Sequence, residues 1–274
     1  QMMAILSGAM AVVPLMAPTL GAWLLILVNW RATYVSLALF AALVLLGLRS
    51  FEESAPHIRQ GKIGIVPVLQ HFSTCVKNRR FLGYQICGTA AFSAIVAYLS
   101  TVSFFMGDVF NLPTQYFGYA FAVTVAGFMV GALLCARVVV RLGINRTLAL
   151  GTTLSLLGAL GQSLGANFSD TPIILLAGCS FIMFLGVGFT SANASMGALS
   201  LFPDHAGSAS AVFGFTQSSV AALVGVIAGH FYDGTLASVT SIMFICAAIG
   251  MLGLPLARAQ IPVRGSSWIR LRGR

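Results

Sequence analysis

Long apolar runs separated by short polar segments dominate this chain as far as residue 257. A helix needs about 20 apolar residues to cross a bilayer. Eight runs meet this requirement, namely 2–28, 32–49, 81–106, 115–139, 147–167, 172–199, 206–230 and 236–257. The pattern therefore predicts an all-α polytopic membrane protein.

Composition supports a membrane protein, because 58% of the residues are hydrophobic and only 8% are charged. A soluble domain carries roughly 25% charged residues. The net charge of +9 raises the question of a nucleic-acid partner. However, the basic residues form short clusters between apolar runs, so we expect a lipid bilayer as the partner and no nucleic acid.

The distribution of lysine and arginine predicts the orientation. If the first helix starts in the cytoplasm, fourteen of the fifteen basic residues fall in cytoplasmic segments, and only Arg31 lies outside. By the positive-inside rule, the 50–80 segment and the C-terminus are then cytoplasmic.

The longest polar stretch, 50–80, divides the predicted helices into a pair and a group of six. Within it, VPVLQHFSTCVKNRRF could form a short helix on the membrane surface. We interpret 1–49 as the last two helices of an N-terminal half, 50–80 as a central cytoplasmic loop, 81–257 as a six-helix C-terminal half and 258–274 as a basic cytoplasmic tail. This is the arrangement expected for the last eight of twelve helices of a transporter built from two related halves. The chain also opens inside an apolar run, which we interpret as the loss of an upstream part.

The stretch VPLMAPTLGAW places two prolines in a predicted membrane helix. Pro14, Pro18 and Gly21 recur at helical spacing and share a face of small residues. Prolines kink a helix and small residues let another helix approach closely. This face is either a kinked packing surface or a seam that controls closure between two halves.

Polar and aromatic side chains inside apolar helices are candidates for a substrate cavity near the midplane. They are Tyr84, Gln85, Ser93, Tyr98, Asn193, Ser195 and Gln217. Each is equally well explained as a hydrogen-bonded packing residue. The GxxxG pairs Gly127/Gly131 and Gly225/Gly229 are expected to serve tight helix packing.

Two cytoplasmic turns carry candidate gate residues. Arg137, Arg141 and Arg146 cluster at the first, where they either form a gate or reflect orientation alone. The second lies in LFPDHAGSASAVFGFTQ, where Asp204 is a gate candidate and a plausible cap for the following helix. His205 beside it is more readily explained as a solvated loop residue than as a proton relay.

Enzyme chemistry is not indicated. The sequence contains no GxxxxGK[ST] loop and no cluster of His, Asp and Glu at metal-binding spacing, so we expect no enzyme, cofactor or metal. All six acidic residues fall at helix ends or in loops, although proton coupling usually needs a buried ionisable group.

Three of these stretches resemble the major facilitator superfamily, and in particular its bicyclomycin/chloramphenicol-resistance (Bcr/CflA) branch of drug:proton antiporters. PLMAPTLGAW followed by NWR is similar to the antiporter motif, with Ala22 where a second glycine is common. GALLCARVVVRLGINR is similar to a loop motif, with Ala136 where an acidic residue is usual. FPDHAGSASA followed by Gln217 is the most specific match.

The resemblance implies a major facilitator fold in the bacterial inner membrane, a monomer, and export of small amphipathic drugs in exchange for protons by alternating access. It also implies that the proton-carrying carboxylate lies on early helices absent from this chain. Two alternatives remain open, namely a metabolite-uptake facilitator of the same fold and a non-transporting remnant.

Overall fold

The computed structural model describes residues 30–49, 72–110, 117–168 and 172–258. The chain divides into two compact units, Gln1–Pro67 and Val68–Arg274, and each is considered by itself. The predicted helix at 2–28, with Pro14, Pro18 and Gly21, lies outside the described residues, as does the predicted tail from residue 259 onward.

In the first unit the structure describes one helix, α2 (Trp30–Leu48). Its sequence carries no charged residue after Arg31, and its length is that of a membrane-spanning segment. Hydropathy alone had predicted this helix at 32–49.

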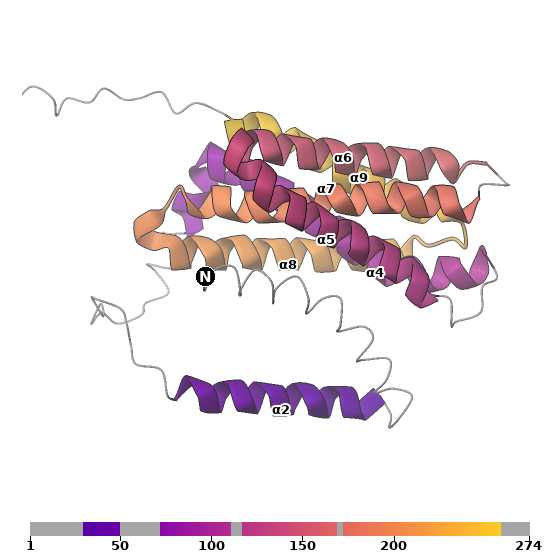
Figure 1. Cartoon of the computed structure of the whole chain (residues 1–274), viewed down its shortest axis with the longest axis horizontal. Helices are drawn as coiled ribbons and strands as arrows, with labels where there is room; N and C mark the ends of the chain where they lie inside the picture. Colours follow the sequence, from indigo (N-terminus) through magenta and orange to yellow (C-terminus); the bar gives the residue numbers. More distant parts are fainter. Residues whose placement is uncertain (1–29, 50–71, 111–116, 169–171, 259–274) are drawn as a thin grey trace, which may run out of the picture. The chain divides into compact units, whose positions relative to one another are not determined.

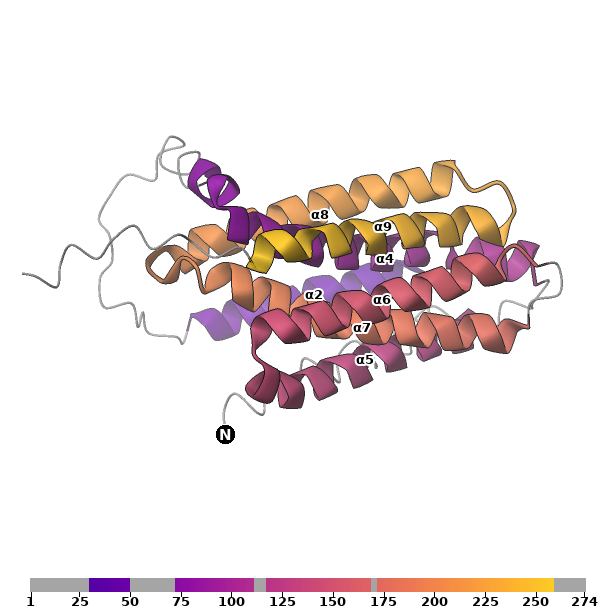
Figure 2. The same cartoon turned by 90° about the horizontal axis from the view of Figure 1, so that it is seen from above.

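The second unit contains six long helices that alternate in direction along one axis (Figures 1 and 2). They are α4 (Arg79–Asp108), α5 (Phe117–Leu142), α6 (Ile144–Gly165), α7 (Ile173–Leu199), α8 (Ala206–His230) and α9 (Leu236–Arg258). Their ends differ from the predicted spans by at most three residues. Together with α2, seven described helices are long and apolar enough to cross a membrane, which confirms the all-α polytopic fold.

Helix α4 lies at the centre of this unit. It packs along α8 and α9 and also contacts α7, whereas α7 packs along α5 and α6. In the apolar window of α4, 67% of the residues are buried, against 22% in α5 and α8. Side chains of α4 therefore face other helices on most sides, and its polar residues must find their partners there.

Glycines set the closest helix contacts. A Cβ atom at Gly127 would lie 2.6 Å from the carbonyl oxygen of Phe181, and one at Gly131 would clash with the carbonyl oxygen of Leu185. Because both carbonyls belong to α7, the α5 and α7 backbones touch along this face. The prediction that Gly127 and Gly131 serve tight packing is confirmed.

The second GxxxG pair behaves differently. A Cβ atom at Gly225 would meet the side chain of Val96 at 2.9 Å, but one at Gly229 would have no described residue within 4 Å. Within the described part of the second unit, the tight packing predicted for Gly229 is therefore not seen.

The chain enters α4 through a short capped turn. Residues 72–77 are helical, within the stretch where the sequence predicted a surface helix. Asn78 then accepts hydrogen bonds on Oδ1 from the backbone N–H groups of Arg80 and Phe81, at 3.0 and 3.2 Å. This side chain satisfies donors that a helix start leaves unpaired, and so α4 begins before the predicted residue 81.

The turn between α7 and α8 contains a 3-10 helix, η2 (Pro203–His205). Asp204 lies inside it, and His205 occupies the N-cap position of α8 without a side-chain cap. The sequence therefore predicted the N-cap position one residue too early, and the Asp204 side chain lies outside the described part of the structure. The physical reason is that Pro203 starts a tight turn, which carries the chain past Asp204 before the α-helix begins.

Candidate functional site: the polar face of α4

Three polar residues recur every fourth position along one face of α4. They are Gln85, Thr89 and Ser93, and all three side chains are buried. Gln85 Nε2 donates to Thr89 Oγ1 at 2.8 Å and to the carbonyl oxygen of Phe213 in α8 at 3.2 Å. The first bond runs along α4 and the second crosses to α8.

Gln217 of α8 completes the contact in the opposite direction. Its Nε2 donates to the carbonyl oxygen of Gly88 in α4 at 3.1 Å. The structure thus brings Gln85 and Gln217, two of the predicted cavity residues, to a single interface. Hydrogen bonds between membrane helices contribute about 0.6 to 2 kcal/mol each, so these two bonds stabilise the α4–α8 pair.

A pocket of about 260 Å³ lies beside these hydrogen bonds, between α4, α8 and α9. It is lined by Leu82, Gln85, Ile86, Thr89, Ala90, Ser93, Thr216, Val220, Val224, Cys246 and Ile249. Gln85 Oε1 and Ser93 Oγ are buried and have no hydrogen-bond partner among the described residues. The surface of the pocket itself is almost entirely apolar.

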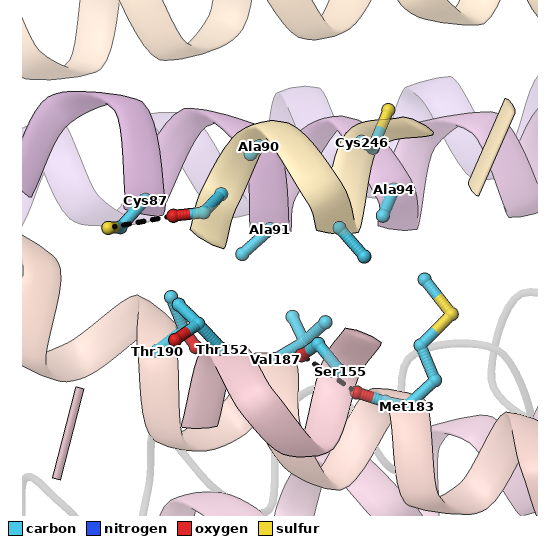
Figure 3. Close-up of a pocket in the computed structure, with 12 residues that line it drawn as sticks. Cys87, Ala90, Ala91, Ala94, Thr152, Ser155, Met183, Val187, Thr190 and Cys246 are labelled. Carbon is cyan, nitrogen blue, oxygen red and sulfur yellow. Dashed lines mark hydrogen bonds between the residues drawn. The ribbon is translucent and has the colours of Figure 1, made fainter. Parts of the chain in front are cut away.

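A second, narrower cavity lies between α4, α6, α7 and α9 (Figure 3). Ala91 and Ala94 face Thr152 and Ser155 across it, and its volume is about 10 Å³. This is room for about one water molecule. Ser155 Oγ donates to the carbonyl oxygen of Met183 at 3.2 Å, so this hydroxyl is already satisfied and the cavity is too small for a drug.

Tyr84 lies near the start of α4, away from the pocket. Its hydroxyl donates to Asn145 Oδ1 of α6 at 2.5 Å. Its ring covers Gly197 of α7, where a Cβ atom would clash with it. This side chain joins three helices and is almost fully buried.

Tyr98 and Asn193 also lie at separate helix junctions. The Tyr98 ring packs edge-on against Phe184 of α7 with centroids 5.2 Å apart, and its hydroxyl pairs with the side chain of Thr124 in α5. Asn193 Nδ2 donates to the carbonyl oxygen of Phe189 at 2.7 Å and to the sulfur of Cys135 at 3.0 Å.

Among the described residues, Ser195 bonds only to carbonyls of its own helix, α7. The seven predicted cavity residues therefore divide into two groups. Gln85, Ser93 and Gln217 gather on the α4–α8 side, whereas the other four are placed elsewhere with partners of their own. Thr89 and Asn145, which bond to Gln85 and Tyr84, were not predicted as site residues from the sequence. The spacing of four residues between Gln85 and Thr89 was the one available signal.

The end of the unit that holds the start of α4 is basic. The candidate gate residues Arg137, Arg141 and Arg146 are exposed there, around the one-residue turn at Gly143. Gly143 has a φ of 76°, which favours glycine and allows α5 to pass directly into α6. The Asp204 side chain lies outside the described part of the structure, so its pairing with these arginines stays a prediction.

The opposite end carries Asp108 and Asp233. The Tyr232 hydroxyl donates to Asp108 Oδ2 at 3.1 Å. Burial, this hydrogen bond and the charges of Asp108 and Asp233 together raise the pKa of Tyr232 to about 12. Asp233 accepts from the hydroxyl and the N–H of Thr235, which lowers the pKa of its carboxyl.

Comparison with known proteins identifies the family of this chain. The model of the Major Facilitator Superfamily matches residues 1–226, which is most of the chain. A bicyclomycin resistance protein homolog of Haemophilus influenzae is 24% identical over 242 residues, covering 87% of this chain and 60% of the relative.

Two further relatives have names of the same kind. The chloramphenicol resistance protein CraA of Acinetobacter baumannii is 26% identical over 69% of this chain and 46% of its own length. Multidrug resistance protein D of Escherichia coli is 26% identical over 92% of this chain and 63% of its own length. The chain thus spans about half to three-fifths of the curated relatives that it matches.

These matches confirm the resemblance to the bicyclomycin and chloramphenicol resistance branch, on a chain whose helices suit a multi-pass membrane protein. The chain therefore belongs to the Major Facilitator Superfamily.

Proposed function

We propose that the protein exports small amphipathic drugs across the bacterial inner membrane, in exchange for protons, by alternating access. The observation that carries this proposal is the similarity along most of the chain to three proteins named for drug resistance. The apolar spans and the few buried polar side chains of α4 are in keeping with amphipathic cargo, because such a site combines apolar walls with a few polar groups.

The orientation belongs to the same proposal. In the described part of the second unit, all lysines and arginines lie at the end where α4 begins, and the end where α4 stops carries only acidic charges. The positive-inside rule places the basic end in the cytoplasm. The end of α9 and the C-terminus would then be cytoplasmic, with Arg137, Arg141, Arg146 and Asp204 in position to form an inner gate.

Proton exchange needs a titratable group within the membrane. The six acidic residues of the chain all lie at helix ends or between the apolar runs. In this proposal, the 274 residues contribute the last two helices of the N-terminal half, the C-terminal half and part of a cavity, and the proton carrier is a group that they do not supply.

The face formed by Pro14, Pro18 and Gly21 is proposed as the seam between the two halves. The test is a drug-susceptibility assay in cells that express the complete reading frame. Gly21→Trp should abolish resistance to chloramphenicol with expression unchanged, because a bulky side chain prevents close helix approach. Met16→Trp, which helical spacing places on the opposite face of the predicted helix, is the matched control and should keep resistance. Full resistance with Gly21→Trp would contradict the seam.

A further inference from the structure

We propose that a basic edge, formed where the chain enters α4 and where α9 ends, binds the phosphate group of an anionic membrane lipid. The edge consists of Lys77, Arg79, Arg80 and Arg258. It lies on the surface of the second unit, outside both cavities described above. The proposal goes beyond drug export and does not depend on it, because it concerns the contact between the protein and the bilayer.

Close packing of α4 against α9 brings these residues to one place. A Cβ atom at Gly83 would clash with the backbone of Ala257, so the two helix backbones touch at this level. Arg80 precedes Gly83 by three residues, which places it on the same face of α4 and about 4.5 Å nearer the helix start. Arg258 directly follows Ala257, and Figure 2 shows the start of α4 and the end of α9 at the same end of the bundle.

The guanidinium group of Arg80 carries the proposal. The side chain is half-buried, and its Nε atom is buried without a hydrogen-bond partner among the described residues. The two Nη atoms do not belong to the buried unpaired atoms, and no bond joins them to another described residue, so they are available at the surface. Arginine stays charged in proteins, and a partly buried charge without a partner is costly. An anion that meets the Nη atoms would offset this cost.

The neighbouring basic residues add positive charge that no described acidic group neutralises. Lys77, Arg79 and Arg258 are exposed, and no ion pair joins them to an acidic side chain in the described part of the structure. A phosphate diester carries a negative charge, and its oxygens accept hydrogen bonds from the planar fork of an arginine. The edge therefore has the charge and the donors that a phosphate headgroup requires.

An apolar stripe on α9 favours a lipid over a free phosphate ion. Ile245, Ile249 and Leu252 recur at helical spacing and are 54%, 47% and 71% exposed. The stripe leads from the middle of α9 toward Arg258. A lipid whose phosphate contacts Arg80 and Arg258 could therefore lay an acyl chain along this stripe. Basic residues at the membrane surface attract anionic lipids in general, whereas the half-buried Arg80 beside the end of α9 would make this position selective.

Native mass spectrometry of the full chain, released from micelles, tests this site. The micelles contain either phosphatidylglycerol or phosphatidylcholine with the same acyl chains. We expect the first phosphatidylglycerol to bind about 10-fold more tightly than phosphatidylcholine. Arg80→Gln should weaken the binding of phosphatidylglycerol about 10-fold or more, as expected for the loss of a hydrogen bond to a charged group.

Two further variants separate the site from general charge effects. Arg258→Gln changes an exposed side chain, so it should keep the fold and still weaken the binding of phosphatidylglycerol. Arg141→Gln removes the same charge at the same end of the bundle, but from an exposed position beside the turn between α5 and α6. It should leave the affinity for the first phosphatidylglycerol unchanged.

Four results would overturn the proposal. Equal binding of the two lipids would mean that the headgroup charge is not recognised. Unchanged binding in Arg80→Gln and Arg258→Gln would mean that another group, such as the carboxylate of Asp204, neutralises the edge. An equal loss in Arg141→Gln would reduce the effect to net charge. Displacement of phosphatidylglycerol by excess inorganic phosphate would assign the edge to a soluble anion, whereas retention of the lipid supports a lipid site.

Discussion

Gln85 of α4 and Gln217 of α8 cross one helix interface in opposite directions, each donating its side-chain amide to a backbone carbonyl of the other helix. Phe213, whose carbonyl oxygen accepts from Gln85, lies about one helical turn from Gln217 on α8. Gly88, whose carbonyl oxygen accepts from Gln217, lies about one helical turn from Gln85 on α4. Apolar packing between membrane helices has no hydrophobic driving force to fix its register. This pair of polar bonds therefore specifies how α8 is seated on α4.

We expect Gln217→Leu to lower the free energy of unfolding by about 0.6 to 2 kcal/mol, the range for one interhelical hydrogen bond in a membrane protein. The reason is loss of the bond to Gly88 at an otherwise apolar contact. Reversible unfolding in mixed micelles would measure the change. Ser219→Ala, exposed on the same helix, is the control and should be neutral. Equal stability of Gln217→Leu and the parent chain would show that the bond does not hold the helices.

The two GxxxG pairs supply a matched test of helix packing. Gly131→Ala should destabilise the fold by about 1 to 3 kcal/mol, as expected for overpacking, because its new Cβ atom would clash with the carbonyl oxygen of Leu185. Gly229→Ala meets no described residue within 4 Å and should be neutral or slightly stabilising. Unfolding midpoints of the two variants would decide. If they shift equally, the close α5–α7 contact does not limit stability.

The segregation of charge predicts which end of the bundle faces the cytoplasm. In a background where the five native cysteines are replaced, Arg146→Cys and Asp233→Cys introduce one exposed thiol at each end. A membrane-impermeant maleimide added to intact cells should label the Asp233→Cys protein at once. The Arg146→Cys protein should be labelled only after the membrane is opened. The reverse pattern would invert the proposed orientation.

Tyr232 should titrate far above an ordinary tyrosine. Its pKa is raised to about 12 by burial, by its hydrogen bond to Asp108 and by the neighbouring negative charges. Since the folded pKa is the higher one, this contribution to stability is present below pH ~10, the ordinary tyrosine pKa, and is lost as pH rises toward 12.

Ultraviolet difference titration between the parent chain and Tyr232→Phe would isolate this group. Asp108→Asn should move the titration midpoint of Tyr232 down toward the ordinary value. The substitution removes the negative charge of Asp108 and changes the acceptor of the Tyr232 hydrogen bond. A midpoint near 10 in the parent chain would rule out the Asp108 contact in solution.

Hydropathy predicted where the helices lie but not which helices touch. A membrane span needs a long apolar run, so its ends can be located in the sequence. Gly131 and Gly229 look alike in the sequence, but only Gly131 faces a neighbouring backbone. Tyr84 and Gln85 are adjacent residues on α4, and one bonds to α6 while the other bonds to α8.

These differences arise because helix neighbours depend on the mutual rotation of helices. The sequence of one apolar span does not specify how that helix is rotated relative to its neighbours. The predicted N-cap position of α8 was wrong by one residue, because hydropathy does not detect the tight turn at Pro203. Two residues of the polar face of α4, Gln85 and Ser93, were predicted from the sequence, whereas Thr89 and the pocket required knowledge of where α8 and α9 lie.

The most direct test of the proposed export is the accumulation of radiolabelled chloramphenicol in cells that express the complete reading frame. Drug export by proton exchange predicts lower accumulation than in cells with an empty vector, and a protonophore should abolish the difference. Higher accumulation in the expressing cells would instead identify an uptake facilitator. Equal accumulation, with the protein present in the membrane, would contradict export of this drug.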